Sequence, residues 1–514
     1  MKNKRYSIPL LLILSIFIII NGCSEDFFDQ RAGDRITPDK HYQSLIDAQV
    51  SMLGAIIPLQ DIMPNMIMLD GLRSDMMDVT NNSGIYLNEI NEQVFSKNNP
   101  YLDPSDLYKV IININELLAN VDQVGEVDRN FDPFVEFTVK QGLYSMRAWV
   151  YLTIARLYNK VAYIEDNMTS LPENLNQNVL DKEPLIDTLI NQLLPYVEFD
   201  AETEFVEAKI SYYVNVKALL GELYLEKGQY ATAAEYLKLA CESYGDDRSM
   251  LKVDQSYRDD AWSSIHLNAE SAFLENLSVI PYSSVEDQFN YLAAWMGYDY
   301  DFMVKPTQIL VDSFMSQINL AGNPGDQYRG MGVTFSLDTL GLIRDTLYET
   351  LPYITKYEID NADPFSSDII ISRAAGIHLL LAEALNRMGD EQSQEYALML
   401  LNEGVNKENP KPPTYARWSS NLGVRGRVYL SPREIPEGLS PDSVTLLIED
   451  FIIAERAMEL AYEGKRWFDL VRIAERRNEP EYLADKVAAK FEGTPKYDMI
   501  RNKLLNQENW YLPF

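Results

Sequence analysis

Histidine, cysteine and positive charge are all scarce in this sequence. Its 514 residues include only three His (His41, His266 and His378) and two Cys (Cys23 and Cys241). Residues so few and so far apart do not supply the closely spaced ligands of a zinc site. Lys and Arg number 45 against 77 Asp and Glu, which gives a formal net charge of −32. So acidic a chain repels phosphate backbones, which excludes nucleic acid as a partner.

The short motifs that mark common enzymes are absent as well. The sequence has no His-Glu-x-x-His segment, no Gly-x-Ser-x-Gly elbow, no phosphate-binding loop and no dinucleotide fingerprint. We therefore predict that the protein is not an enzyme and needs no cofactor. Loop carboxylates leave calcium as an open alternative, although no EF-hand loop is present.

The N-terminus has the features of a bacterial export signal. Three basic residues stand within the first five positions, and an apolar run over 8–20 follows. That run is shorter than the roughly 20 residues of a membrane-spanning helix. Residues 20–23, Ile-Asn-Gly-Cys, resemble a lipobox, with a less usual Asn before the glycine. We predict a signal peptide over 1–22 and lipidation of Cys23, with an ordinary secretory signal as the alternative.

Helical periodicity dominates the rest of the chain. Residues 139–160 place apolar side chains at three- and four-residue spacing, and 211–242 predicts two helices separated by a break at Gly228. The second segment follows the tetratricopeptide spacing, with small residues such as Gly221 where antiparallel helices approach. A weaker copy covers 375–405. We predict a mostly α fold with tetratricopeptide-like helical hairpins near these three segments.

Three long segments between the helices lack periodicity, namely 245–300, 315–368 and 406–445. Loops of this length in a folded protein are usually functional or disordered, and their aromatic content argues against disorder. We expect them to be variable, ligand-binding loops. Residues 331–357, within the second of them, predict a small β-hairpin.

One charged stretch, residues 455–472 (ERAMELAYEGKRWFDLVR), raises the question of catalysis. Glu455, Glu459 and Glu463 recur every four residues and so share one helical face. Paired carboxylates can hydrolyse glycosides, but a general acid needs a raised pKa, and the interleaved arginines would lower it. We predict instead that these charges form ion pairs that fasten the helix to its neighbours. Gly464 is expected to end the helix.

Four segments, taken together and in order, resemble the SusD/RagB family. They are similar to the family's N-terminal segment, its Leu-Arg-Ala…Tyr helix, its Arg-Tyr-Ala-Asp…Ala-Glu-Ala-Leu-Asn helix and its Glu-Arg…Glu-Leu…Gly-Lys-Arg-Trp-Phe-Asp-Leu signature. In this chain they are residues 26–56, 142–164, 368–389 and 455–472. The third segment departs from the family spelling at Ala375 and Gly376. The C-terminal NWYLPF resembles the start of the closing Leu-Pro-Ile-Pro segment but stops early, so the packing of the last loop is expected to differ.

The resemblance implies a non-enzymatic, nutrient-binding lipoprotein, with residues 23–514 forming one SusD-like domain. It implies an oligosaccharide or polysaccharide ligand and a SusC-like TonB-dependent transporter, on which the protein acts as a lid. The acidic residues after Cys23 are similar to a surface-export signal. The expected location is therefore the outer membrane, lipid-anchored and facing the cell exterior. A peptide-binding member of the family and a scaffold that binds only proteins are the alternatives.

Candidate ligand-binding residues follow from the chemistry of sugars, which present faces of C–H bonds ringed by hydroxyls. Aromatic rings rimmed by polar side chains suit such faces, and the resemblance implies a site in loops away from the helical repeats. Trp262 and Trp418 lie in irregular segments, but aromatics concentrate most in 291–302, and 71–86 offers a polar loop after the first helix. The candidates are Trp295, Tyr298, Asp299 and Tyr300 in the former and Arg73, Asp75, Asn81 and Tyr86 in the latter. The alternative is that such aromatics only fill gaps beneath the loops.

Overall fold

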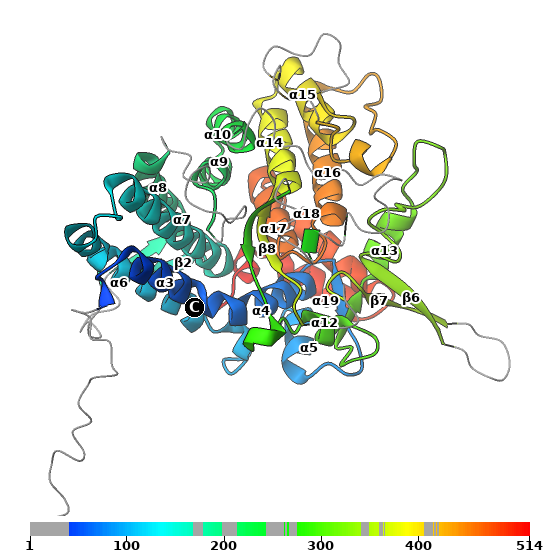
Figure 1. Ribbon diagram of the computed structural model, residues 1–514. Helices are drawn as coiled ribbons and strands as arrows, with labels where there is room; N and C mark the ends of the chain where they lie inside the picture. Colours follow the sequence, from blue (N-terminus) through cyan, green and yellow to red (C-terminus); the bar gives the residue numbers. More distant parts are fainter. Residues whose placement is uncertain are drawn as a thin grey trace, which may run out of the picture.

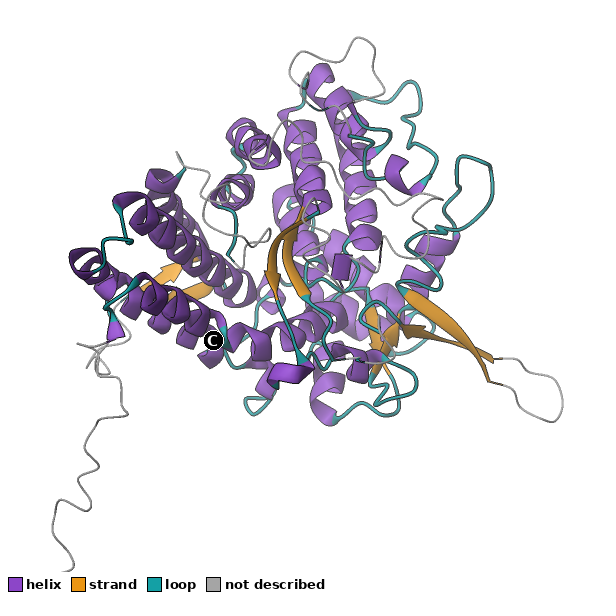
Figure 2. Cartoon of the chain, viewed as in Figure 1, coloured by secondary structure: helices purple, strands orange, loops and turns teal. Residues whose placement is uncertain are grey.

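The fold is predominantly helical, as predicted (Figures 1 and 2). The computed structural model of the chain describes residues 41–167, 178–197, 213–242, 262, 265–266, 275–340, 349–358, 363, 365–405, 415, 418 and 421–513. The predicted signal peptide, Cys23 and much of the three long loops lie outside these residues. In the described part, strands occur only as two-stranded antiparallel pairs.

The N-terminal helices run from one side of the molecule to beneath its centre (Figure 1). They are α3 (Leu45–Ile56), α4 (Pro58–Arg73), α5 (Ile85–Asn91), α6 (Ser105–Val127), α7 (Pro133–Tyr158) and α8 (Lys182–Leu193). Helix α7 begins six residues before the predicted segment because Asp132 caps it, accepting hydrogen bonds from the backbone N–H of Phe134 and Val135 at 2.8 and 2.9 Å. Asn159, in the left-handed region with φ 58°, ends it.

Segment Leu45–Arg73 is long and apolar enough, by composition alone, to cross a membrane. Its second part, α4, instead lies in the core of the fold, where its buried residues include Leu59, Ile67 and Leu72. The apolar character of α4 is therefore explained by packing against other helices of the chain.

The predicted segment 139–160 lies almost entirely in the single long helix α7, which packs against α6 and α8. Near 211–242 and 375–405, two helical hairpins confirm the tetratricopeptide-like prediction. They are α9 (Val216–Glu226) with α10 (Tyr230–Glu242), and α14 (Ala374–Met388) with α15 (Glu391–Leu401). Gly228 and Gly389 turn the chain with φ of 70° and 82°, a conformation that L side chains rarely adopt. Gly221 of α9 faces Leu237 of α10 so closely that an added Cβ would come within 2.5 Å of the leucine Cγ. Only glycine permits this approach.

A pair of alanine substitutions tests the packing around the helical glycines, with opposite expected signs. Gly376, in the first turn of α14, has space for a Cβ, since the nearest atoms are the Leu460 methyl groups at 3.8 Å. Gly376→Ala should raise the free energy of unfolding by about 0.5–1 kcal/mol through helix propensity. Gly221→Ala should lower it by about 1–3 kcal/mol through overpacking against Leu237. Urea denaturation measures both, and equal shifts of one sign would contradict the described packing.

The C-terminal helices are α16 (Pro441–Glu459), α17 (Arg466–Arg477), α18 (Pro480–Ala488) and α19 (Lys496–Leu504). Helix α12 (Leu292–Met296) lies in the first long segment, and α13 (Gln308–Met315) lies between the first and the second. Helix α16 ends at Glu459, earlier than the expected end at Gly464, which is a correction. The chain turns over 460–465, where both Tyr462 and Gly464 have positive φ. Two such residues are incompatible with a continuing right-handed helix.

The four strand pairs are short. They are β1 (Met77–Val79) with β5 (Val304–Pro306), β2 (Lys160–Ala162) with β3 (Val179–Asp181), β4 (Asn276–Ile280) with β8 (Ile369–Arg373), and β6 (Phe335–Leu340) with β7 (Glu349–Ile354). The β6–β7 pair confirms the hairpin predicted in 331–357, and it projects from the body of the molecule (Figure 2).

The carboxylates of 455–472 form buried ion pairs, as predicted. Glu455 contacts Arg425 and Arg329 at 2.6 and 2.8 Å. Glu459 contacts Arg373 and Arg329, each at 2.6 Å, together with Arg427.

Glu463 completes this network with Lys356 at 2.6 Å and Arg373 at 3.0 Å. Burial alone would raise the pKa of Glu463, but the charges of Arg373 and Lys356 lower it to about 2. An acid held ionised in this way cannot donate a proton at neutral pH, so the stretch braces the fold.

Candidate functional site

The two segments predicted to bind ligand meet in the structure. Strand β1 pairs with β5, placing Met77 opposite Pro306 and Val79 opposite Val304. Beyond the strands, the N–H of Thr80 donates to the carbonyl of Met303 at 3.0 Å. The amide of Asn82 donates to the carbonyl of Asp301, also at 3.0 Å. The turn that carries Asn81 therefore lies against the segment that follows Tyr300.

Segment 292–303 is held as a compact loop by its own backbone. The N–H of Met303 donates to the carbonyl of Trp295 at 2.7 Å, and the N–H of Asp301 donates to that of Ala294 at 3.0 Å. Gly297 makes this closure possible, because a Cβ there would lie 2.6 Å from the carbonyl oxygen of Ala293. The side chains of the loop are thus presented on a fixed backbone.

Four aromatic rings gather at the start of this loop, and we call them the Trp295 cluster: Phe289, Tyr291, Trp295 and Phe365. The rings of Tyr291 and Trp295 stack, with centroids 6.0 Å apart and an interplanar angle of 20°. Phe365 meets both Phe289 and Tyr291 edge-on. Tyr291 is 47% exposed and Trp295 is only partly buried. The cluster therefore offers an aromatic surface to solvent.

A second group of rings, the Tyr298 cluster, joins the loop to the β6–β7 hairpin. Tyr298 lies 5.5 Å from Phe302 and 5.7 Å from Tyr353 of β7 between ring centroids. Its hydroxyl donates a hydrogen bond to Asp338 of β6, which raises the pKa of Tyr298. Tyr300, between Tyr298 and Phe302 in sequence, is 42% exposed, and Asp299 is exposed beside it.

Arg73 and Asp75 do not occupy the polar surface loop expected for them, which is a correction. Arg73 is the last residue of α4 and is fully buried, with its guanidinium 3.9 Å from the ring centroid of Trp467. It donates to the backbone carbonyl of Trp510 at 2.9 Å. Asp75, also buried, accepts two hydrogen bonds from Arg466, each of 2.7 Å. Neither side chain reaches solvent. Arg73 packs on Trp467 and Asp75 neutralises the charge of Arg466, and both of these partners belong to α17.

The other candidates of the 71–86 segment lie nearer the surface. Asn81 is exposed in the turn between β1 and α5, and Tyr86 is partly buried on the first turn of α5. The carbonyl of Tyr86 accepts a hydrogen bond from the side chain of Asn99 at 3.1 Å.

All six tryptophans of the chain lie in the described residues. Five of them are buried, and only Trp295 is not. Trp262 and Trp418, in irregular segments of the sequence, are 3% and 0% exposed. The indole N–H of Trp418 donates to Glu242 at 3.0 Å, which ties that loop to the end of α10. For these two, the reading that loop aromatics fill gaps is correct.

The residues that complete the two clusters come from segments distant in the sequence. Phe365 and Tyr353 come from the far side of the 315–368 segment, more than fifty residues from Trp295, and Asp338 comes from the opposite strand of the hairpin. Nothing local in the sequence indicated their approach. Phe289, which stands two residues before Tyr291, could have been included from its proximity in the chain.

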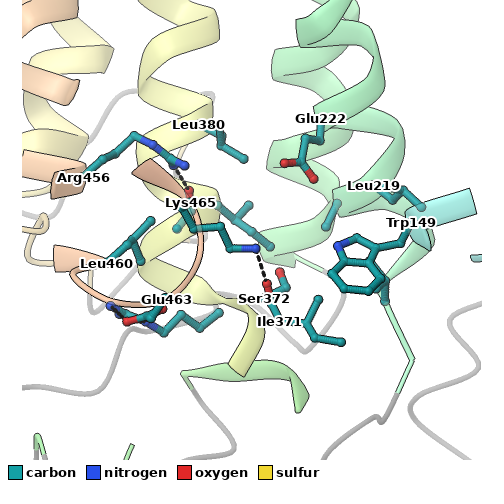
Figure 3. A pocket seen from close by; sticks show the side chains of 15 residues that line it. Trp149, Leu219, Glu222, Ile371, Ser372, Leu380, Arg456, Leu460, Glu463 and Lys465 are labelled. Carbon is teal, nitrogen blue, oxygen red and sulfur yellow. Dashed lines mark hydrogen bonds and ion pairs between the residues drawn. The ribbon is translucent and has the colours of Figure 1, made fainter. Parts of the chain in front are cut away.

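A small hollow provides a different kind of candidate, between α7 and α9 on one side and α14 with the turn 460–465 on the other (Figure 3). Trp149, Glu222 and Lys465 reach its wall. Lys465 donates to the carbonyl of Ile371 at 2.8 Å, and Glu222 pairs with Arg156 at 3.0 Å. Burial alone would raise the pKa of Glu222, but the charge of Arg156 holds it below its usual value. Since these charged groups already have protein partners, we interpret the hollow as a packing gap between α7 and α9 on one side and α14 on the other, and not as a ligand site.

Metal binding has little support in the described residues, where no group of three or more His, Cys, Asp or Glu side chains could hold an ion. The aromatic clusters, with Asn81 and Asp299 beside them, are therefore the candidate ligand-binding site. Helix α12 and the base of the hairpin lie at the opposite end of the molecule from α10 and α15 (Figure 1). This is the placement that the resemblance implied for a ligand site.

Known proteins resemble this chain in sequence and in fold. Residues 354–514 match the model of the SusD family. The chain is 22% identical over 504 residues to SusD-like protein P2 of Formosa agariphila, covering 91% of each. Its fold is similar to a SusD superfamily protein from Bacteroides vulgatus, with a TM-score of 0.66, 15% identity and coverage of 91% and 95%. A SusD-like carbohydrate binding protein from Bacteroides fragilis aligns with a TM-score of 0.61 and 16% identity over 86% and 88%.

Proposed function

We propose that the chain is a SusD-like, lipid-anchored, cell-surface protein that binds a glycan and delivers it to a TonB-dependent outer-membrane transporter. The match of residues 354–514 to the SusD family model and the likeness to SusD-like protein P2 over 91% of the chain support this proposal. In this proposal residues 1–22 are the signal peptide, Cys23 carries the lipid, and residues 23–514 form the binding domain. We infer binding rather than catalysis because the carboxylates of 455–472 are held ionised in ion pairs. The carbohydrate-binding description of the Bacteroides fragilis protein adds support for a glycan.

The exposed aromatic surface around Trp295 carries the proposal. Stacked Tyr291 and Trp295 suit the C–H face of a pyranose ring, and an aromatic contact of this kind removes apolar surface from water on both sides. Asn81 and Asp299, exposed nearby, offer an amide and a carboxylate for sugar hydroxyls. Because the loop is fixed by its backbone hydrogen bonds, little ordering entropy opposes binding.

The test is calorimetric titration of a form beginning at residue 24 with a panel of polysaccharides and of peptides. This form keeps all the contacts described above, which lie within 41–513. We expect at least one glycan to bind, and Trp295→Ala to weaken that binding roughly tenfold to a hundredfold. Binding of peptides in place of glycans would contradict a glycan ligand and support the alternative that the protein binds peptides.

Tyr429→Asn is the matched control, since Tyr429 is as exposed as Tyr300, at 42%, but lies outside both clusters. Its φ of 61° suits asparagine, so the substitution introduces no backbone strain. Affinity should be unchanged in this variant. Glycan binding that survives Trp295→Ala intact would remove the Trp295 cluster from the proposal. Copurification from membranes with a transporter tests the delivery step, and its absence would favour a free-standing binding protein.

A further inference from the structure

Among the described residues that frame the aromatic site, carboxylates are numerous and exposed cations are absent. The segments that frame it are 80–86, 284–303, 335–338, 351–358 and 365–368, together with Asp363. Four of their carboxylates are exposed and four are partly buried. In order, these eight are Glu286, Asp287, Asp299, Asp301, Asp338, Glu358, Asp363 and Asp368.

The one basic residue in these segments, Lys356, is not available to a ligand. It is buried, and its ammonium group donates to the carbonyl of Ala461 at 2.7 Å and to Glu463 at 2.6 Å. Arg73, the cation expected from the sequence to face a ligand here, is buried against Trp467. Lys305 follows the site on β5, where it is partly buried opposite Asp78. The framing segments therefore present no exposed cation.

The carboxylates also lie close enough to influence one another. Burial, with repulsion from Asp299, raises the pKa of Glu358. The hydrogen bond that Tyr298 donates to Asp338 raises the pKa of the tyrosine. Asp363 accepts hydrogen bonds from the hydroxyls of Ser284 and Ser366 at 2.6 and 2.5 Å, which lower its pKa and keep it charged.

We propose that this site selects glycans that carry no carboxylate or sulfate groups and discriminates against anionic polysaccharides. The inference rests on the proposed function, because it concerns the ligand of the same site. Like charges brought together at a binding surface oppose association, and an arginine or lysine is the usual partner of a carboxylate or sulfate. With eight carboxylates and no exposed cation in the framing segments, an anionic sugar placed on Trp295 is repelled. For neutral hexoses and amine-bearing sugars, the same carboxylates accept hydrogen bonds from the hydroxyl and amine groups of the sugar.

Quenching of tryptophan fluorescence measures the charge around Trp295 directly, without knowledge of the ligand. Since the other five tryptophans are buried, the accessible part of the emission arises from Trp295, and Trp295→Phe identifies it. We expect iodide to quench this emission several-fold less than it quenches free N-acetyltryptophanamide, after normalisation to neutral acrylamide. Caesium should show no such protection. The protection should shrink as sodium chloride is raised, because salt screens exposed charges.

A charge-neutralising variant and a matched control separate local from overall charge. Asp299→Asn/Asp301→Asn should raise iodide quenching of Trp295. Glu391→Gln/Glu395→Gln removes two exposed carboxylates from α15, at the other end of the molecule, and should leave it unchanged. Iodide quenching as efficient as that of the free indole, or equal effects of the two variants, would overturn the inference.

Matched glycan pairs extend the test to binding. Hydroxyethyl cellulose against carboxymethyl cellulose, and dextran against dextran sulfate, differ chiefly in charge. At low salt, the neutral member of a bound pair should bind roughly tenfold more tightly, and Asp299→Asn/Asp301→Asn should narrow that ratio. An anionic member that binds as well as its neutral partner would overturn the charge selection while leaving the proposed function standing. If no glycan binds, the proposed function fails, and the quenching result still decides the charge at the site.

Discussion

Arg373→Met is expected to lower the free energy of unfolding by about 3–5 kcal/mol, a large part of the stability of an ordinary domain. The guanidinium of Arg373 is 1% exposed and contacts Glu459 at 2.6 Å, Glu275 at 2.7 Å and Glu463 at 3.0 Å. Methionine has a similar volume but no charge. It would leave three buried carboxylates with fewer cations, and an uncompensated buried charge costs more than the pair contributes.

The control is an arginine–carboxylate pair of the same length at the surface. Arg501 contacts Asp485 at 2.6 Å, but the two side chains are 31% and 51% exposed. Arg501→Met should change stability by less than about 1 kcal/mol, because water screens exposed pairs. Urea denaturation followed by near-ultraviolet circular dichroism measures both variants. If Arg373→Met proves too unstable to purify, Glu275→Gln gives a milder change at the same cluster. A shift no larger than that of Arg501→Met would contradict the bracing role.

The same network predicts how stability depends on pH. The pKa of Glu463 is about 2 in the fold, against an ordinary value of 4.5, so the unfolded chain binds more protons in the interval between them. The stabilisation from this carboxylate is therefore complete above about pH 5 and is lost as pH falls toward 2. Arg373→Met should flatten this part of the stability curve, because Glu463 then loses its principal cationic neighbour.

Asp75→Ala is the second substitution with a large expected effect, a loss of about 3–5 kcal/mol in the free energy of unfolding. Asp75 accepts both hydrogen bonds of a bidentate pair with Arg466, at the start of α17. Burial alone would raise the pKa of Asp75, but the charge and hydrogen bonds of Arg466 hold it below the usual value. Removing the carboxylate leaves Arg466 buried with a single described acceptor, the carbonyl of Ile453 at 3.1 Å.

This substitution also separates a structural from a ligand-binding role for Asp75. At a temperature where the variant remains folded, its glycan affinity should match that of the parent protein. Asn81→Ala, in the exposed turn six residues on, should show the opposite pattern, with stability retained and affinity lowered. Stability and affinity are read from urea denaturation and calorimetry on the same preparations. A folded Asp75→Ala protein with weakened binding would return Asp75 to the ligand site.

Patterns of short range in the sequence were enough for the secondary structure and for the character of the charged stretch. The three- and four-residue spacing of apolar side chains placed α7, α9, α10, α14 and α15, since a helix buries one face whatever it packs against. Glycines at 221 and 228 gave the hairpin, because only glycine allows the close approach and the left-handed turn there. The interleaved acids and arginines of 455–472 predicted ion pairs, although not their partners.

The tertiary structure alone decided which of the candidate residues face solvent. Arg73 and Asp75 stand in a polar sequence, yet the packing of α4 against α17 buries both and supplies Trp467 and Arg466 as partners. Trp262 and Trp418 are buried and Trp295 is not. Residues distant in sequence cover the first two, Arg373 in the case of Trp262 and His378 in the case of Trp418.

The joining of distant segments was equally beyond the sequence. Pairing of β1 with β5 brings the Asn81 turn against 301–303 across more than two hundred residues, and Phe365 and Tyr353 reach the aromatic clusters from the next long segment. The residues and their chemistry were thus determined by the sequence. Their assembly into one acidic, aromatic surface depends on long-range contacts, whose free energy comes from the packing of the whole fold and leaves no local periodicity to detect.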